Sequence, residues 1–380
     1  MNKIVLVPDS FKGTLSAIKI CDIINEEIIK VFPECRVVPT PIADGGEGTV
    51  DSFLVSVKGR KVFTEVTGPY FERVNSYYGI IDGGKTAIIE MSAAAGLPMV
   101  SGHENPSATT TYGVGELILH AVNSGAKKII IGLGGSCTND GGCGLLAALG
   151  IRFLNKNSES FIPVGGTLNE IVDIDTEQKD KRLSGLDINA MCDVTNPLYG
   201  PKGAAHIFAP QKGAGEEMVK MLDNNLRIFG DLLEKISMKT GVTKLPGAGA
   251  AGGLGAGLNA LLDVPLVSGI ELILETIKFD NIIENADLII TGEGQIDGQS
   301  LEGKVIFGVS KYAKNNAIPL CVIAGQAIDD QLDNAYDHGI SGIFTINRKA
   351  APYCESKYYA EENLRFTIRN IMTFIKAIKN

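Results

Sequence analysis

Five short stretches of the chain gather carboxylates, hydroxyls, amides and lysines at the ends of apolar runs. Carboxylates can deprotonate a hydroxyl group or hold Mg²⁺, and lysines with hydroxyls bind small anions. Together these side chains favour Mg²⁺-dependent chemistry on a phosphate and a small anionic substrate. The stretches are "PDSFKGT" (8–14), "IADGGEGT" (42–49), "GLGGSCTNDGG" (132–142), "CDVTNPLYGPKG" (192–203) with "APQKGA" (209–214), and "TGEGQIDGQSLEGK" (291–304).

The third stretch lies inside "IIIGLGGSCTNDGGCGLLAALG" (129–150), an apolar run that breaks into glycines and becomes apolar again. This pattern predicts a buried strand, a bare loop and a helix that begins near Gly144. Backbone N–H groups exposed in such a loop, next to a helix start, can bind an anion without a lysine. We predict a nucleotide site here, made by Gly134, Gly135, Ser136, Thr138, Asn139 and Asp140. Close packing of the strand against the helix is the alternative.

The fourth stretch carries an acid at a strand end, followed by an amide and lysines. Asp193 would orient or deprotonate an acceptor hydroxyl, and Asn196 and Lys212 would bind substrate. His206 lies in an apolar segment and is expected in the core rather than as a ligand.

The remaining stretches offer further candidates, each with a plainer interpretation. Ser10 and Lys12 suit a small acid or a phosphate, although Lys12 could be a solvated loop lysine. Asp44 is a second candidate for the catalytic acid or base, unless it only favours a helix start. Glu293 and Asp297 are the candidate magnesium contacts, direct or through water.

Two familiar motifs occur without the context that they need. "GIIDGGKT" (79–86) matches the phosphate-loop pattern, but "AIIEM" follows it as another strand, so we predict a β-hairpin. "GAGAAG" (247–252) matches the dinucleotide fingerprint, but the segment before it is short and ends in proline. An NAD(P)-dependent oxidoreductase acting on a small hydroxy acid is therefore the alternative function.

The elements that must position these residues alternate between apolar strands and amphipathic helices at both ends of the chain. This pattern predicts an α/β fold with parallel sheets. We expect two domains: a flavodoxin- or Rossmann-like domain of residues 1–86 plus 282–380, and an inserted α/β domain of residues 87–281. Ser16 is the expected N-cap of the first helix.

Composition excludes several classes of function. The chain has 380 residues, a formal charge of −9 and no lysine- or arginine-rich cluster, so neither nucleic acid nor a membrane is an expected partner. Seven cysteines without a CxxC pair argue against a zinc site or a disulfide framework and fit the cytoplasm. The first apolar run is too short for a signal peptide.

The chain resembles the bacterial glycerate kinases. The resemblance covers nearly the whole sequence and rests on "VPDSFKGTLSA", "PIADGGEGT", "IEMSAAAGL", "GLGGSCTNDGGCG", "CDVTNPLYGPKGAA", "FAPQKGA", "GAGAAGGLGAGL" and "DLIITGEGQIDGQSLEGK". It implies an inserted domain like that of restriction endonucleases and an active site in the cleft between the domains. It also implies ATP- and Mg²⁺-dependent phosphorylation of D-glycerate to 2-phosphoglycerate, with 3-phosphoglycerate as the other possible product. A monomer and a homodimer both remain open.

Overall fold

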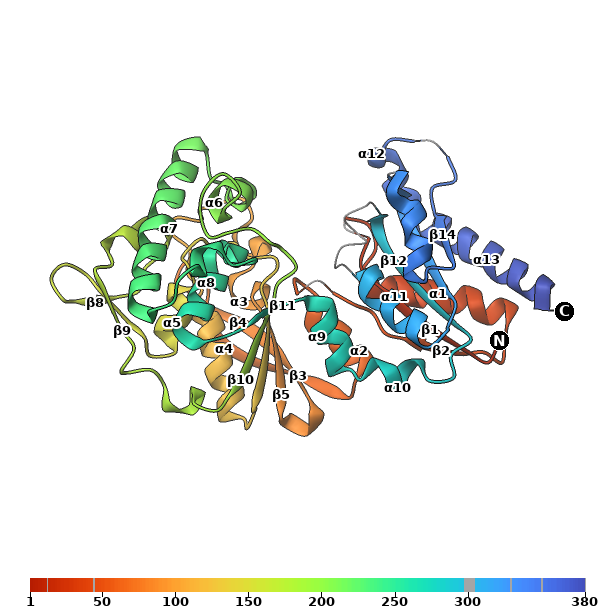
Figure 1. Cartoon of the computed structure of the whole chain (residues 1–380), viewed down its shortest axis with the longest axis horizontal. Coiled ribbons are helices and arrows are strands. Elements are labelled where there is room, and N and C mark those ends of the chain that lie inside the picture. Colours follow the sequence, from red (N-terminus) through yellow and green to blue (C-terminus); the bar gives the residue numbers. More distant parts are fainter. Residues whose placement is uncertain (12, 44, 297–304, 329, 350, 380) are drawn as a thin grey trace. The chain divides into compact units, whose positions relative to one another are not determined.

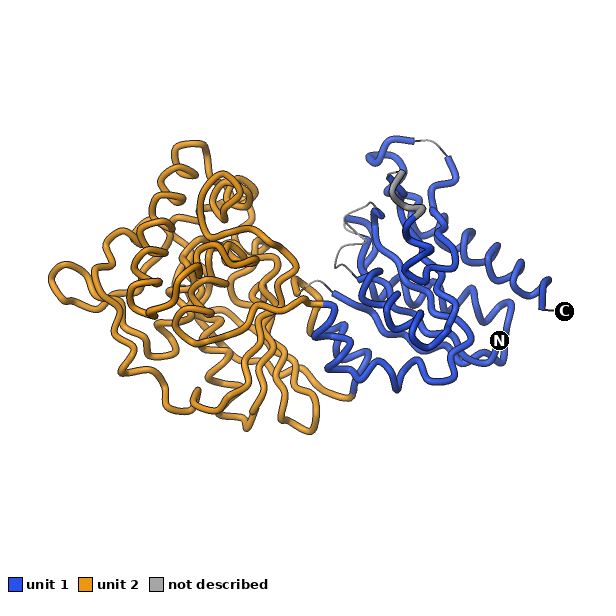
Figure 2. The backbone as a smooth tube through the Cα atoms, viewed as in Figure 1, with its two compact units in different colours: residues 1–43, 51–57, 270–380 blue, residues 44–50, 58–269 orange. Residues whose placement is uncertain are grey.

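The computed structural model describes residues 1–11, 13–43, 45–296, 305–328, 330–349 and 351–379. The chain forms two compact units, shown in blue and orange in Figure 2. Unit 1 contains residues 1–43, 51–57 and 270–380, and unit 2 contains residues 44–50 and 58–269. Both units combine parallel strands with helices, which confirms the predicted α/β class.

Unit 1 is built on a five-stranded sheet in which all neighbours are parallel, in the order β14-β13-β12-β1-β2. Numbered along the chain, this order is 2-1-3-4-5, the order of flavodoxin-like sheets. The strands are β1 (Lys3–Pro8), β2 (Arg36–Pro39), β12 (Leu288–Ile296), β13 (Leu320–Ala327) and β14 (Gly342–Thr345).

Two long helices of unit 1, α1 (Ala17–Val31) and α13 (Ala360–Lys379), pack against each other (Figure 1). Ser16 caps α1 as predicted, since its hydroxyl accepts a hydrogen bond from the backbone N–H of Lys19. Isoleucines spaced three and four apart make the buried face of α1. The other helices of unit 1 are α9 (Gly269–Thr276), whose first residue belongs to unit 2, α10 (Phe279–Ile283), α11 (Val305–Asn315) and α12 (Tyr353–Ser356).

Unit 2 is built on a six-stranded sheet in the order β11-β10-β6-β5-β4-β3. Four strands are parallel, β5 (Thr86–Glu90), β6 (Lys128–Gly132), β10 (Asp187–Met191) and β11 (Leu266–Val267). An antiparallel pair, β3 (Gly59–Thr67) and β4 (Arg73–Ile81), completes the sheet. A small second sheet contains β7 (Arg152–Leu154), β8 (Ser160–Phe161) and β9 (Asp173–Asp175).

The bounds of unit 2 differ from the predicted boundaries at residues 87 and 281. Sequence analysis placed residues 59–81 in the first domain, but they form the strand pair β3–β4, and β4 pairs with β5 in antiparallel register, Ile81 opposite Thr86. This pairing carries the hairpin into the sheet of unit 2. The turn between β4 and β5 is "DGG" (82–84), so the "GIIDGGKT" segment is a β-hairpin, as predicted.

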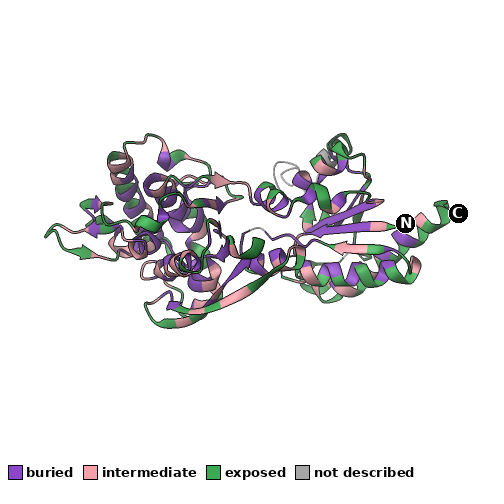
Figure 3. Cartoon of the chain, turned by 90° about the horizontal axis from the view of Figure 1, so that it is seen from below, coloured by how far each residue is buried: buried purple, intermediate pink, exposed green. Residues whose placement is uncertain are grey.

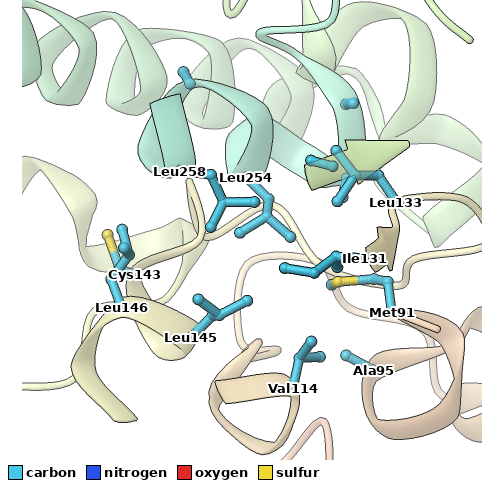
Figure 4. Packing of buried hydrophobic residues seen from close by; sticks show 14 of the residues in the cluster. Met91, Ala95, Val114, Ile131, Leu133, Cys143, Leu145, Leu146, Leu254 and Leu258 are labelled. Carbon is cyan, nitrogen blue, oxygen red and sulfur yellow. The ribbon is translucent and has the colours of Figure 1, made fainter. Parts of the chain in front are cut away.

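Helices cover the sheet of unit 2 and close one large apolar core. Figure 3 shows the buried strands in purple, and Figure 4 shows Val114, Leu145 and Leu254, from three different helices, gathered around Ile131 of β6. The helices of unit 2 are α3 (Ser92–Ala95), α4 (Tyr112–Asn123), α5 (Cys143–Ala148), α6 (Ala204–Phe208), α7 (Glu216–Ser237) and α8 (Ala250–Leu262); helix α2 (Thr49–Ser56) begins in unit 2 and ends in unit 1.

Candidate active site

The parallel strands of unit 2 end in register at one edge of the sheet. Glu90 of β5 pairs with Gly132 of β6, and Gly132 pairs with Met191 of β10. The segments that follow these strands therefore leave the sheet side by side, and in open α/β sheets ligands bind at this edge. Both the glycine loop, defined as residues 133–142, and Asp193 follow strands here, as the sequence predicted.

Close packing explains part of the glycine loop. The backbone N–H of Gly134 donates to the carbonyl oxygen of Gly45 at 3.1 Å, and a Cβ atom on Gly134 would lie 2.8 Å from Cα of Gly46. The expectation that the Gly134 N–H faces a ligand is therefore wrong: glycine is needed here because the stretch 45–46 lies against the loop. Further along, the N–H of Cys137 donates to the carbonyl oxygen of Ala95.

Asp140 stabilises the loop from inside. Its fully buried carboxylate accepts hydrogen bonds from the N–H and hydroxyl of Thr111 and from the N–H groups of Gly142 and Gly144, at 2.8–3.2 Å. Burial raises the pKa of Asp140, and these four donors favour its ionised form. Because Asp140 takes up the donors at the start of α5, it serves the loop's conformation instead of the predicted nucleotide contact.

Gly135 is the exposed residue of the glycine loop. Its φ of +75° is a left-handed conformation that favours glycine, and a Cβ atom there would lie 3.3 Å from Cβ of Ser92. Ser136 follows and is almost buried, with 7% of its surface exposed. These two residues remain the candidates for a ligand contact in the loop.

Lys212 lies under the glycine loop. Its Nζ donates to Ser136 Oγ at 2.8 Å and to the carbonyl oxygen of Thr138 at 2.7 Å, and only 3% of the residue is exposed. Burial lowers the pKa of Lys212 to about 8, while the nearby Cys137 and Asp140 act in the opposite direction. In the described part of the chain no carboxylate lies within ion-pair distance of this ammonium group.

Two further side chains of the loop, Thr138 and Asn139, are fully buried. The hydroxyl of Thr138 and both polar atoms of the Asn139 amide have no hydrogen-bond partner within the described residues. Both side chains, which the sequence assigned to nucleotide contact, therefore lie inside the fold.

Asp193 follows β10 and is exposed, and its Oδ1 accepts a hydrogen bond from the backbone N–H of Gly269 at 2.8 Å. This contact fixes the carboxylate at the first residue of α9. Asn196 is half-buried, and its amide donates to the carbonyl oxygen of Lys202, so it shapes its own loop. His206 is exposed and lies 3.8 Å from Asp223, so its expected place in the core is wrong.

Sequence reasoning did not single out Glu90, the last residue of β5. This fully buried carboxylate accepts hydrogen bonds from the N–H of Val50 at 2.6 Å and from the hydroxyl of Tyr77 at 3.1 Å. It thereby anchors the start of α2 and, with it, the stretch 45–49. A charged residue that ends the apolar strand "TAIIE" was the available signal.

A second group of predicted residues lies in unit 1, where β1 and β12 are neighbours. Ser10 follows β1, and Glu293 lies in β12, one residue beyond the partner of Pro8. The strand order of the sheet reverses between these two strands, which is where flavodoxin-like sheets bind ligands. Lys12, Asp44 and Asp297 lie outside the described residues.

The described residues contain no group of three or more His, Cys, Asp or Glu side chains that could hold a metal ion by themselves. Protein-bound Mg²⁺ often has only one or two carboxylate ligands, with phosphates and water completing its coordination. Glu293, a buried acid at the switch point, fits that limited role.

A surface cavity of about 720 Å³ lies in unit 2 near the start of β10, lined by Asp187, Ser184 and Val264 among others. None of the predicted site residues lines it.

No helix in the described ranges combines the length and apolar character that crossing a bilayer requires.

Several known proteins that are similar to this chain are named glycerate kinases. The glycerate kinase family model matches residues 4–376. A Bacillus cereus protein named glycerate kinase is 48% identical over 97% of this chain and 97% of its own length, and an Escherichia coli protein named glycerate 2-kinase is 44% identical over the same shares. A solved Salmonella typhimurium structure described as putative glycerate kinase 2 aligns with a TM-score of 0.85 and 40% identity, covering 100% of this chain and 99% of that one.

These similarities support the kinase and not the oxidoreductase. The dinucleotide-like segment "GAGAAG" also lacks the strand that such a fingerprint follows. It comes after a short 3₁₀ helix (Val242–Lys244) and runs into the kinked start of α8.

Proposed function

The chain belongs to the glycerate kinase family and is a kinase, and we propose that it transfers the γ-phosphoryl group of ATP to the 2-hydroxyl of D-glycerate. The observation that carries the choice of product is the full-length similarity to the E. coli protein named glycerate 2-kinase. The geometry of unit 2 supports a kinase, because a buried lysine underlies a glycine loop at the sheet edge from which Asp193 also emerges.

In the proposed reaction the glycerate hydroxyl oxygen bonds to the γ-phosphorus as the bond to the β–γ bridging oxygen breaks, and ADP leaves. Asp193 takes the hydroxyl proton, with its carboxylate oriented by the Gly269 N–H. In this proposal the exposed Gly135 and the nearly buried Ser136 beside it contact the phosphates. Asp44 remains the second candidate for the base.

We also propose roles for residues predicted from the sequence of unit 1. Ser10, with Lys12, would bind the glycerate carboxylate or the transferred phosphoryl group, and Glu293, with Asp297, would hold Mg²⁺. Bound Mg²⁺ would neutralise charge that develops on the phosphates. Asn196 remains a candidate for substrate binding, and its amide nitrogen also donates to the carbonyl oxygen of Lys202.

A coupled assay tests both the reaction and its product. ADP formation is measured with ATP, Mg²⁺ and D-glycerate, and then enolase is added with or without phosphoglycerate mutase. The 2-phosphate gives an enolase signal without the mutase. A signal that needs the mutase would identify the 3-phosphate, and an absence of glycerate-dependent ADP release would contradict the proposed function.

A further inference from the structure

We propose that Lys212 acts on the nucleotide through Ser136: the buried ammonium orients the Ser136 hydroxyl so that it donates its proton to a phosphate bound at the glycine loop. This inference rests on the proposed function and assigns Lys212 a positioning role in place of the substrate contact expected from the sequence. Ser136 is then the residue that touches the phosphate.

The argument starts from the hydrogen bond between Lys212 and Ser136. An ammonium group can only donate, so in the 2.8 Å contact the Ser136 oxygen is the acceptor. A hydroxyl has a single proton, and this proton cannot point at the ammonium group. The Ser136 O–H must therefore donate elsewhere, and an anion is the acceptor that a neighbouring positive charge favours.

The position of Lys212 supports an indirect role. Both of its described hydrogen bonds end on the glycine loop, at Ser136 and Thr138, and the residue is buried beneath that loop. The ammonium group therefore has little surface of its own with which to contact a ligand at the exposed face of the loop. Ser136 and the exposed Gly135 are the residues in between.

The buried charge also needs an explanation, because an unpaired ammonium in a protein interior is costly. Asp140, the carboxylate whose charge acts on Lys212, accepts hydrogen bonds from four other donors, two on Thr111 and two in its own segment. The ammonium group therefore makes no direct contact with a carboxylate among the described residues, and its charge lies in a region of low dielectric. Such preorganised charge stabilises an anion more than a solvated lysine would.

A double-mutant cycle with MgADP as the probe tests the inference. Lys212→Met and Ser136→Ala should each weaken MgADP binding about tenfold, measured by calorimetry. Because the lysine acts through the serine, the double variant should lose about as much as either single variant. The KM for D-glycerate should stay within about twofold, which a collapsed loop would not allow. Lys220→Met, at an exposed lysine of α7, is the matched control.

Three results would overturn the inference. Losses that multiply to about a hundredfold in the double variant would mean that the two residues contact the ligand independently. Wild-type MgADP affinity in Lys212→Met would remove the lysine from the site. A change confined to the KM for D-glycerate would place the acceptor, instead of the nucleotide, at the loop. Wild-type protein without glycerate-dependent ADP release would instead contradict the proposed function.

If Lys212→Met does not fold, the pH dependence of Ser136→Ala decides the question. The lysine is charged below its pKa and neutral above it, so wild-type MgADP affinity should fall as pH rises through about 8. Ser136→Ala should abolish this fall, and an unchanged pH dependence would contradict the inference. The neighbouring ionisable groups are Cys137 and Asp140 of the loop, Cys143 of α5 and Glu104, which lies beside Gly213.

Discussion

Single residues of the site differ in how far the sequence could predict them. The position of Asp193 after a strand was predictable, because an acid follows an apolar run there, and α/β sheets bind ligands at such strand ends. The burial of Lys212 was not predictable, because lysines are almost always exposed. Its two hydrogen-bond partners, Thr138 and Ser136, also lie 74 and 76 positions earlier in the chain. The sequence indicated that Asp140 is polar but not that it is buried, because Thr111, which supplies two of its donors, lies 29 positions earlier in the chain.

Asp193→Asn separates the charge of this residue from its structural contact. The asparagine oxygen can still accept the hydrogen bond from Gly269, so α9 keeps its first contact. Without a base, kcat should fall about 10²- to 10⁴-fold, while both KM values change only a few fold. Steady-state kinetics with varied ATP and D-glycerate measure this.

The matched control is Asp263→Asn, because Asp263 is exposed and pairs only with Lys239 in a surface salt bridge. Its kinetics should equal those of the wild type. Turnover of Asp193→Asn within severalfold of the wild-type value would remove Asp193 from the mechanism and leave Asp44 as the candidate base.

At the scale of elements, local pattern was sufficient for apolar strands such as β1, β6 and β12, for α1 with its Ser16 cap and for the hairpin at 82–84. Local pattern was not sufficient to predict the role of the glycines, because the stretch 45–46, which packs on Gly134, comes about ninety residues earlier in the chain. A glycine required by a tertiary contact and a glycine required by a ligand look alike in one sequence. Of the predicted loop, only Gly135 and Ser136 keep the geometry of a ligand contact.

The packing of α1 on α13 depends on one buried carboxylate. Glu27 of α1 accepts hydrogen bonds from Lys30 and from Arg365 and Arg369 of α13. Burial alone would raise the pKa of Glu27, but the hydrogen bonds from Arg369 and Lys30 outweigh it and lower the pKa to about 2. The ionised form of Glu27 therefore stabilises the folded state.

This pKa fixes how stability depends on pH. The stabilisation by Glu27 is complete above the pKa of an unfolded glutamate, ~4.3, and is lost as pH falls through about 2. Glu27→Gln should lower the free energy of unfolding at pH 7 by about 2–4 kcal/mol and flatten this part of the acid dependence. Urea unfolding between pH 2 and pH 7 measures both effects.

Glu26→Gln is the control for that experiment, because Glu26 is half-exposed and pairs with Arg365 at the surface. A surface pair contributes at most ~1 kcal/mol, so this variant should unfold nearly as the wild type does. Equal stability of Glu27→Gln and wild type at pH 7 would show that the two helices do not depend on the buried carboxylate.

At the scale of the whole molecule, sequence motifs predicted the family, and the α/β class followed from strand and helix alternation. The limits of the units could not be read in the same way. Sequence analysis placed the segment 59–81 in the first domain, whereas its pairing with β5 assigns it to unit 2. Such a pairing depends on which strand edge of a sheet is free to pair. The pattern of residues along the chain does not show this.

The seven cysteines, all within the described residues, allow a prediction of thiol reactivity. None forms a disulfide, five are buried and one is partly buried, while Cys354 is exposed. Burial raises the pKa of both Cys137 and Cys321 to about 12, so neither forms the reactive thiolate at neutral pH. Titration with a chromogenic disulfide should therefore show one fast thiol in the native protein and seven in denaturant.

Cys354→Ser should remove the fast phase and leave the thermal unfolding midpoint unchanged. Because no disulfide restricts the unfolded chain, a reductant should not shift the midpoint of the wild type either. Fewer than seven reactive thiols in denaturant without reductant would reveal a disulfide and contradict the arrangement of all seven cysteines. A fast phase that persists in Cys354→Ser would show that one of the buried thiols becomes accessible while the protein remains folded.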